Sequence, residues 1–176
     1  MSMKFNLNKS LEILERTPAV LEQLLSGLSD DWVMINEGGE TWSAYDVVGH
    51  LIHGEKTDWM ERIEKTLGEN PDNKFKTFDR FAQFTESKGK TLQQLLTEFA
   101  ELRKKNIALL KSKNITGEKL HSKGIHPKFG EVTLEQLLST WTVHDLTHIA
   151  QITRVMAKQY KENVGPWLEF FTLLNK

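Results

Sequence analysis

Apolar residues recur at steps of three and four over four long stretches of this 176-residue chain. This spacing places them on one face of an α-helix, and it predicts helices over residues 6–28, 42–68, 91–112 and 133–156. No stretch shows the sustained alternation of apolar and polar residues that is typical of a β-strand. The sequence therefore predicts an all-α fold, a four-helix bundle formed by a single domain over residues 1–176.

Residues that favour helix ends support this division of the chain. Ser43 and Thr133 are predicted N-caps of the second and fourth helices, because their hydroxyls can accept a hydrogen bond from a free backbone N–H. Gly68 is well suited to end the second helix. Pro18 interrupts the first periodic stretch and predicts a kink or two abutting helices. Pro166 is favourable at the first position of a short closing helix.

Two connections are longer than bundles usually require. Residues 69–90 exceed the two to eight residues common between bundle helices, and long connections often cover a site. Three aromatic rings in this segment either plug the end of the core or form a lid: Phe78, Phe81 and Phe84. Residues 113–130 are expected to be irregular. His121 and His126 in this segment are expected to be solvated, although one of them could approach the mouth of a pocket.

The composition excludes several classes of protein. The chain has 23 basic and 24 acidic residues and a formal net charge of −1, so it does not have the basic surface expected of a protein that binds nucleic acid or anionic membranes. It has no cysteine, which excludes disulfides, zinc–thiolate sites and a cysteine nucleophile. It also has no apolar leader and no run approaching the ~20 apolar residues of a membrane span. We expect a cytoplasmic protein.

Two histidines mark the fourth predicted helix. His144 and His148 are four residues apart, so they lie one turn apart on the same helix face, together with apolar residues such as Trp141. A buried ring nitrogen without a partner costs about 1–3 kcal/mol. These rings therefore need either polar neighbours in the core or a metal ion, and the spacing alone does not decide between the two.

The second predicted helix offers two further histidines. His50 and His53 are three residues apart and diverge by about 60° around the helix axis. The strongest apolar face of this helix, which includes Leu51, points away from both, so periodicity does not choose between them. Gly54 follows His50 by one turn and would let a ligand or another helix approach closely, which favours His50.

At these residues the chain resembles the DinB-like (YfiT-like) family of bacterial helical bundles. In that family a tryptophan of the second helix precedes a histidine by eight residues, as Trp42 precedes His50 here. A late helix of the family carries the pattern Trp-x-x-His-x-x-x-His-x-x-Gln, which matches Trp141, His144, His148 and Gln151. The resemblance extends over nearly the whole chain.

The resemblance implies an up-up-down-down bundle with long connections, a short C-terminal helix and a homodimeric assembly. It also implies a divalent metal ion held by three histidines: His50, His144 and His148. His53 has no role in the family pattern and is expected to be a supporting or surface residue. Gln151 and Asp145 are expected to orient their neighbours rather than to bind the ion.

Three neutral imidazoles suit Zn²⁺, Ni²⁺ or Fe²⁺. Three protein ligands leave a position for water or substrate, as in catalytic rather than structural sites. Such an ion favours ionisation of a water or a thiol. Relatives in the family include S-transferases and isomerases that use low-molecular-weight thiols such as bacillithiol or mycothiol. The resemblance therefore implies a thiol-dependent S-transferase or a hydrolase that acts on a small electrophilic substrate.

Two alternatives accompany this hypothesis. The chain could be a non-catalytic bundle that binds metal or another protein through structural histidines. The run from His144 to His148 also invites comparison with the metalloprotease motif His-Glu-x-x-His. Here Asp145 replaces the glutamate, and its shorter side chain disfavours a peptidase. Three carboxylates of the second helix are candidate proton acceptors or solvated surface groups: Glu55, Asp58 and Glu61.

Overall fold

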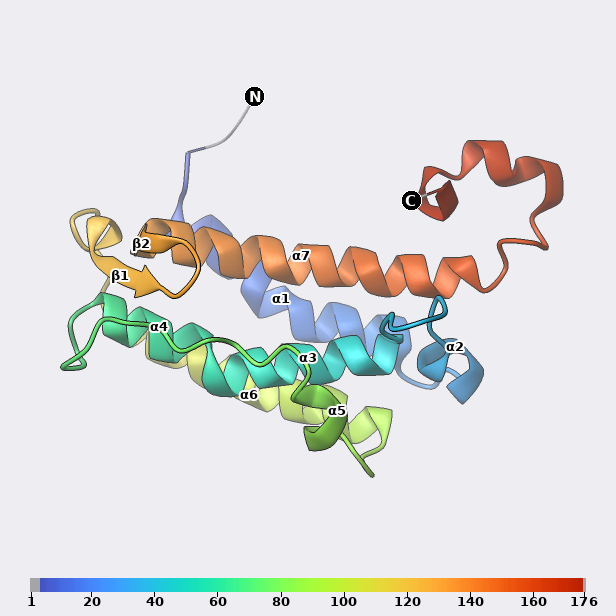
Figure 1. Ribbon diagram of the computed structural model, residues 1–176, viewed down its shortest axis with the longest axis horizontal. Coiled ribbons are helices and arrows are strands. Elements are labelled where there is room, and N and C mark those ends of the chain that lie inside the picture. Colours follow the sequence, from blue (N-terminus) through green and yellow to red (C-terminus); the bar gives the residue numbers. More distant parts are fainter. Residues whose placement is uncertain (1–3, 176) are drawn as a thin grey trace.

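The computed structural model describes residues 4–175 of the chain. Four long helical segments pack side by side (Figure 1): α1 (Leu7–Leu25), α3 (Ala44–Thr57) continued by α4 (Trp59–Thr66), α6 (Leu92–Ser112) and α7 (Leu134–Lys158). α1 and α3 each pack against both α6 and α7, so α1 and α3 lie on one diagonal of the bundle. The predicted four-helix bundle is confirmed.

The helices run in the order up, down, down, up. α1 and α7 point one way along the bundle, and α3 and α6 point the other way (Figure 1). The short helix α2 (Asp30–Met34) joins α1 to α3 at one end, so only residues 67–91, which include α5 (Gln83–Glu86), run along the length of the bundle. An up-up-down-down order needs two such crossings. The observed order therefore differs from the one that the family resemblance implies.

α1 continues through Pro18 as one helix. Proline has no N–H, so the carbonyl of Leu14 four residues earlier loses its donor within the helix. Arg103 of α6 donates its Nη1–H to this carbonyl at 2.8 Å. Two abutting helices, one of the expected outcomes at Pro18, do not form, because a tertiary hydrogen bond satisfies the free carbonyl.

The second predicted helix is divided at Asp58. α3 ends at Thr57 and α4 begins at Trp59, and Asp58 itself has φ −119° and ψ −67°. The Thr57 hydroxyl donates to the carbonyl of His53 at 2.8 Å. Bonds of this kind between a threonine and the preceding turn bend helices. α3 and α4 are therefore separate helices in one wall of the bundle.

The segment 113–130 contains structure that was not expected. It forms the short 3₁₀ helix η1 (Lys119–His121) and the strand β1 (Lys123–His126), which pairs antiparallel with β2 (Gly130–Thr133). The expectation that the chain has no strand is wrong, because four-residue strands are too short to display an alternating pattern. The N–H of Phe75 donates to the carbonyl of Ile125 at 2.8 Å and ties the crossing segment to this hairpin.

Both helix caps singled out in the sequence are present. The hydroxyl of Ser43 accepts from the N–H of Asp46, and that of Thr133 accepts from the N–H of Gln136, each within a complete capping box. These caps fix where α3 and α7 begin. They therefore set the position of every side chain along the two helices that carry the histidines.

The closing segment forms two short 3₁₀ helices, η2 (Gly165–Phe170) and η3 (Thr172–Asn175), in place of an α-helix. It turns beyond the end of α7, and η3 comes back against α7 (Figure 1). Trp167 and Phe170 are 64% and 71% exposed. Most of its aromatic surface therefore stays outside the core. Within residues 4–175, no helix has the length and apolar character needed to cross a bilayer.

Candidate metal centre

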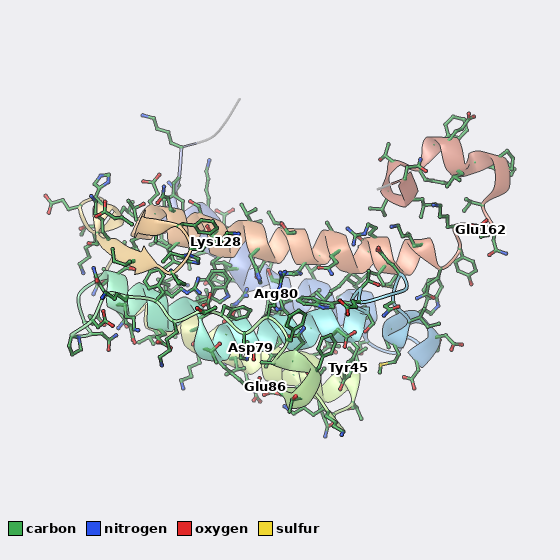
Figure 2. The ribbon with its side chains drawn as sticks, viewed as in Figure 1. Tyr45, Asp79, Arg80, Glu86, Lys128 and Glu162 are labelled. Atoms are coloured by element: carbon green, nitrogen blue, oxygen red, sulfur yellow. The ribbon has the colours of Figure 1, made fainter. Side chains whose placement is uncertain are left out.

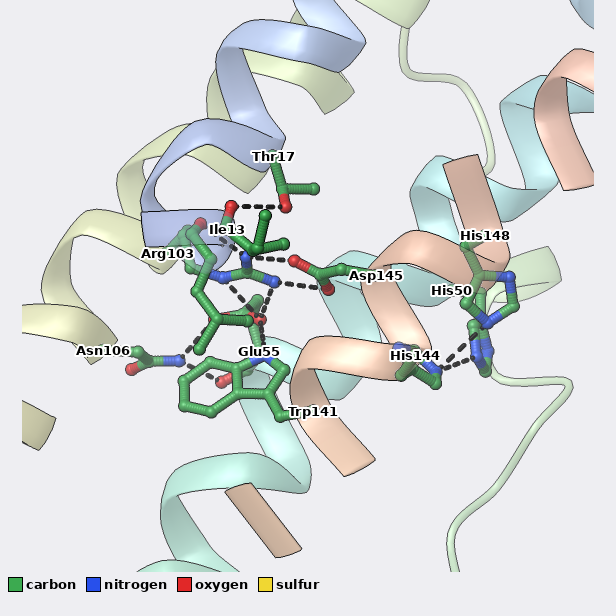
Figure 3. A network of polar contacts seen from close by, with 11 residues as sticks. Ile13, Thr17, His50, Glu55, Arg103, Asn106, Trp141, His144, Asp145 and His148 are labelled. Atoms are coloured by element: carbon green, nitrogen blue, oxygen red, sulfur yellow. Dashed lines mark hydrogen bonds and ion pairs between the residues drawn. The ribbon is translucent and has the colours of Figure 1, made fainter. Parts of the chain in front are cut away.

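Three histidines from two helices converge on one point inside the bundle. His50 lies on α3, and His144 and His148 lie one turn apart on α7. The Nε2 atom of His144 lies 3.2 Å from Nε2 of His50 and 3.1 Å from Nε2 of His148. The donor atoms of all three residues lie within 4.8 Å of one another (Figure 3).

These distances fit a common metal ion. Bonds of ~2.0–2.1 Å from zinc to imidazole nitrogens, at tetrahedral angles, place the nitrogens roughly 3.3 Å apart. The nitrogens of His144 already lie close to that separation from both partners. The arrangement of donors is therefore compatible with a divalent ion.

The environment keeps the three rings neutral, which is the form that binds metal. Burial is the largest cause. Together with the charges of neighbouring residues, it lowers the pKa of His50 to about 3 and that of His144 to about 2. Burial also lowers the pKa of His148. At neutral pH each ring therefore has a lone pair available for an ion.

The remaining ring nitrogens differ in their partners. Nδ1 of His148 donates its hydrogen to Oε1 of Gln151 at 2.8 Å, which leaves the lone pair on Nε2, directed at His144. Nδ1 of His50 and Nδ1 of His144 are buried and have no hydrogen-bond partner among the described residues. Three rings that face one another through Nε2 cannot all find hydrogen-bond partners in one another. A metal ion would bind the nitrogen lone pairs that are left without a partner.

The structure distinguishes His50 from His53. Both are buried at 6% exposure, so the expectation that His53 could be a surface residue is wrong. Nδ1 of His53 lies 3.0 Å from Oε1 of Glu86, so this ring is paired with α5 and does not belong to the cluster of the other three histidines. Its ring contacts Phe78, whose ring in turn meets His50 edge-on at 5.4 Å. Gly54 lies beside the site as expected, and its α-hydrogen leaves room for the Trp59 indole.

A cavity of about 980 Å³ opens onto the three histidines. Aromatic rings line its wall: Trp42 lies 4.8 Å from the ring of His50, and Trp59 lies 5.1 Å from that of His144. His126 of the hairpin also lines the cavity, so one of the two loop histidines does reach the pocket. A separate groove of about 780 Å³ between α1 and α6 is lined by none of the three histidines.

Comparison with known proteins assigns the family. A family model of the DinB superfamily matches residues 13–152. The chain belongs to the DinB superfamily. A solved structure described as "YfiT from Bacillus subtilis is a probable metal-dependent hydrolase with an unusual four-helix bundle topology" superimposes with a TM-score of 0.73. It shares 23% sequence identity, and the match covers 94% of this chain and 91% of that one, which shows a common fold. No curated protein matches the chain.

This DinB-superfamily protein also has a buried ionic network behind the histidines. Arg103 of α6 donates from Nη2 to Glu55 of α3 at 2.8 Å and to Asp145 of α7 at 3.0 Å. Asn106 and Trp141 donate to the carboxylate of Glu55 at 3.0 and 3.3 Å. Burial raises the pKa of Glu55, and Arg103 opposes that rise. The network joins the two helices that carry the histidines (Figure 3).

The three candidate proton acceptors lie in different surroundings. Glu55 is held in the Arg103 network, so the expectation of a solvated surface carboxylate is wrong for it. Glu61 is partly exposed and lies near Lys65. Asp58 lines the cavity and is paired with Arg62 at 2.6 Å. Burial raises the pKa of Asp58 to about 6, so of the three it is the best placed to exchange a proton near neutral pH.

The sequence interpretation missed Arg103. A signal was present, because Arg103 falls on the apolar stripe of α6 between Phe99 and Ile107, four residues from each. A charged residue at such a position needs a buried partner. The sequence did single out Gln151 and Asp145 as residues that orient their neighbours. In the structure Gln151 contacts the ring of His148, and Asp145 contacts Arg103.

Proposed function

We propose that this DinB-superfamily protein is a metal-dependent enzyme in which His50, His144 and His148 hold one divalent ion. One observation carries the proposal: the Nε2 atoms of three neutral histidines converge at the wall of a cavity. Nε2 of His144 lies 3.2 Å from that of His50 and 3.1 Å from that of His148. Three ligands leave room for a guest at the ion. The ion would be Zn²⁺, Ni²⁺ or Fe²⁺.

The ion would supply Lewis acidity, which polarises an electrophile and favours ionisation of a water or thiol nucleophile. The residues around it have separate tasks. Gln151 holds the ring of His148 in the tautomer that offers Nε2. Trp42 and Trp59 form apolar walls that exclude water from the reacting groups. Asp58 accepts the proton released by the nucleophile.

We propose a hydrolase or a thiol S-transferase acting on a small electrophilic molecule. The printed description of YfiT as a metal-dependent hydrolase supports the first reaction, and the family resemblance supports the second. The two share a site and differ in the nucleophile, which is water in one case and a low-molecular-weight thiol in the other. Asp58, a carboxylate of raised pKa in the cavity, can accept the proton that either nucleophile loses at neutral pH, so it is compatible with both reactions.

Metal analysis tests the site. Protein purified without an affinity tag is dialysed against Zn²⁺, Ni²⁺ or Co²⁺, and bound metal is measured by mass spectrometry. We expect one equivalent in the wild type, and a large loss in His50→Ala, His144→Ala and His148→Ala. His53→Ala, a buried histidine outside the three, and the exposed His121→Ala are the controls. Equal metal content in all variants would contradict the proposed metal site.

A second experiment separates the reactions. The Co²⁺-substituted protein is titrated with 2-mercaptoethanol while its visible spectrum is recorded. A new sulfur-to-cobalt band would support S-transfer, which is then assayed with 1-chloro-2,4-dinitrobenzene. An unchanged spectrum together with turnover of a p-nitrophenyl ester would support the hydrolase. Metal binding without either activity would favour the non-catalytic metal-binding bundle.

The assembly and location of the protein stay predictions. The outer face of α7 exposes Val143 and Leu146 at 60% and 47%, and this apolar face supports the proposed homodimer. Size-exclusion chromatography with light scattering tests it, because a monomer at micromolar concentration would contradict the proposal. A cytoplasmic location rests on the sequence arguments alone.

A further inference from the structure

The cavity is more positively charged than the chain as a whole. The formal net charge of the chain is −1. Four cationic side chains and two carboxylates line the cavity, and the histidines beside them are neutral: Arg62, Arg80, Lys128, Arg154, Glu40 and Asp58. The lining therefore has a formal charge of +2, whereas the whole chain has a formal charge of −1. A cavity of one sign concentrates ligands of the opposite sign.

Two of the four cations are already engaged. Nε of Arg62 lies 2.6 Å from Asp58, and Nε of Arg154 lies 2.6 Å from Glu37. Arg80 of the crossing segment has no ion pair with any carboxylate of residues 4–175. Arg80 and His50 line the same cavity. Arg80 is thus an uncompensated cation close to the candidate metal centre.

Lys128 supplies a second uncompensated charge from a different part of the chain. It lies in the turn of the hairpin between β1 and β2, and its Nζ lies 5.6 Å from the centre of the Phe129 ring. No ion pair joins Lys128 to a carboxylate of the described chain. In Figure 2 Arg80 is labelled between α7 and α3, and Lys128 is labelled beside the hairpin near the start of α7. Two segments 48 residues apart in the sequence therefore bring free cations to one cavity.

The same cavity has apolar surface that the fold leaves exposed. Phe81 and Phe129 both line it and are 60% and 69% exposed. Rings that only plugged a core would be buried, so the plug, one of the two alternatives for Phe81, is not observed. Together with Trp42 they offer flat surfaces against which an apolar or aromatic ligand can pack.

We propose that the cavity binds small molecules with an apolar or aromatic body and a terminal carboxylate or phosphate group. Arg80 is the principal group that receives the anion, and Lys128 assists from the hairpin. A guanidinium suits this role, because its N–H groups match the oxygens of either anion in a paired geometry. The orientation of the bound ligand rests on the proposed function. With its anionic group at Arg80, the opposite end of the substrate would face the three histidines.

The test uses metal-free protein, so that the anion cannot bind an ion instead. Protein treated with EDTA is titrated with 3-phenylpropionate, with phenylphosphonate and with uncharged 3-phenylpropionamide, by calorimetry and by tryptophan fluorescence. We expect either anion to bind at least about tenfold more tightly than the amide. The stronger of the two anions identifies whether the carboxylate or the phosphate is preferred.

Variants assign the effect to Arg80. Arg80→Met should reduce the preference for the anion to about twofold or less, and Arg80→Lys should retain part of it. Lys88→Met is the matched control, because Lys88 is an exposed cation of the same segment that does not line the cavity. Circular dichroism confirms that each variant is folded.

Three results would overturn the inference. These are equal affinity for the anions and the amide, an undiminished preference in Arg80→Met, or no binding of any probe up to about 10 mM. Failure of the metal centre is recognised separately by metal analysis. A chain that binds no metal but prefers anions through Arg80 would refute the proposed function and support this inference.

Discussion

His144 and Asp145 are consecutive residues whose side chains serve different sides of α7. Nε2 of His144 lies 3.2 Å from Nε2 of His50, whereas Oδ1 of Asp145 accepts a hydrogen bond from Arg103 at 3.0 Å (Figure 3). Arg103 also bonds Glu55, which lies five residues after His50 on α3. Arg103 therefore holds α7 and α3 together on the side of α7 opposite to the histidines. This contact in turn sets the distance between His50 on α3 and His144 on α7.

Removing the cation from this network should strongly destabilise the fold. Arg103→Met leaves the carboxylates of Glu55 and Asp145 buried without their partner and frees the carbonyl of Leu14. We expect a loss of about 3–5 kcal/mol in the free energy of unfolding, measured by urea denaturation. Lys105→Met, an exposed cation of the same helix, should change stability by less than about 0.5 kcal/mol. Similar stability of both variants would contradict the role assigned to Arg103.

Metal and stability should be linked through His50. Zn²⁺ at a hundred times its dissociation constant should stabilise the wild type by about 2.7 kcal/mol. His50→Leu should lose this gain, yet without metal it should be at least as stable as the wild type, because it removes a buried Nδ1 that has no partner. Thermal melts with and without Zn²⁺ measure both effects. A His50→Leu variant that is unstable without metal would show that the ring has a structural role instead.

Gln151 should tune metal affinity without binding the ion. Gln151→Leu removes the acceptor for Nδ1–H of His148, so the ring is free to turn and to change tautomer. Loss of such a supporting contact typically weakens metal binding by about 10–100-fold. Competition with a chromogenic chelator measures this change. Thr147→Ala, on the exposed face of α7, is the control and should leave the affinity unchanged.

Asp58 should make its own contribution to the pH dependence of stability. Burial raises its pKa in the folded protein to about 6, from the usual 3.8. Between these values the folded state binds the proton more tightly than the unfolded state, so this contribution to stability is complete below pH 3.8 and is lost as the pH rises to about 6. The total change is on the order of 2–3 kcal/mol.

The variant Asp58→Asn tests this contribution. Its free energy of unfolding relative to the wild type should rise between about pH 4 and pH 6.5, and then stay constant. The pair with Arg62 is lost in the variant, which shifts the whole curve but adds no second pH dependence in this range. Parallel curves for the two proteins would show that Asp58 does not titrate near neutral pH.

The sequence by itself determined the helices, their caps and the face on which His144 and His148 lie. Apolar spacing and the hydroxyls of Ser43 and Thr133 are local properties, and local hydrogen bonds of the backbone enforce them. The one-turn separation of the two histidines follows from helix geometry alone. The structure has these features, although the second predicted helix is divided at Asp58 and the closing segment forms 3₁₀ helices.

Only the tertiary structure decided which faces meet. Spacing could not choose between His50 and His53, and packing of α3 between α6 and α7 turned His50 toward the other histidines. The same packing buried Arg103 among carboxylates of two other helices and gave the carbonyl at Pro18 a donor. Helix periodicity fixes directions around one axis, whereas the rotation of one helix relative to another depends on contacts between residues distant in the sequence.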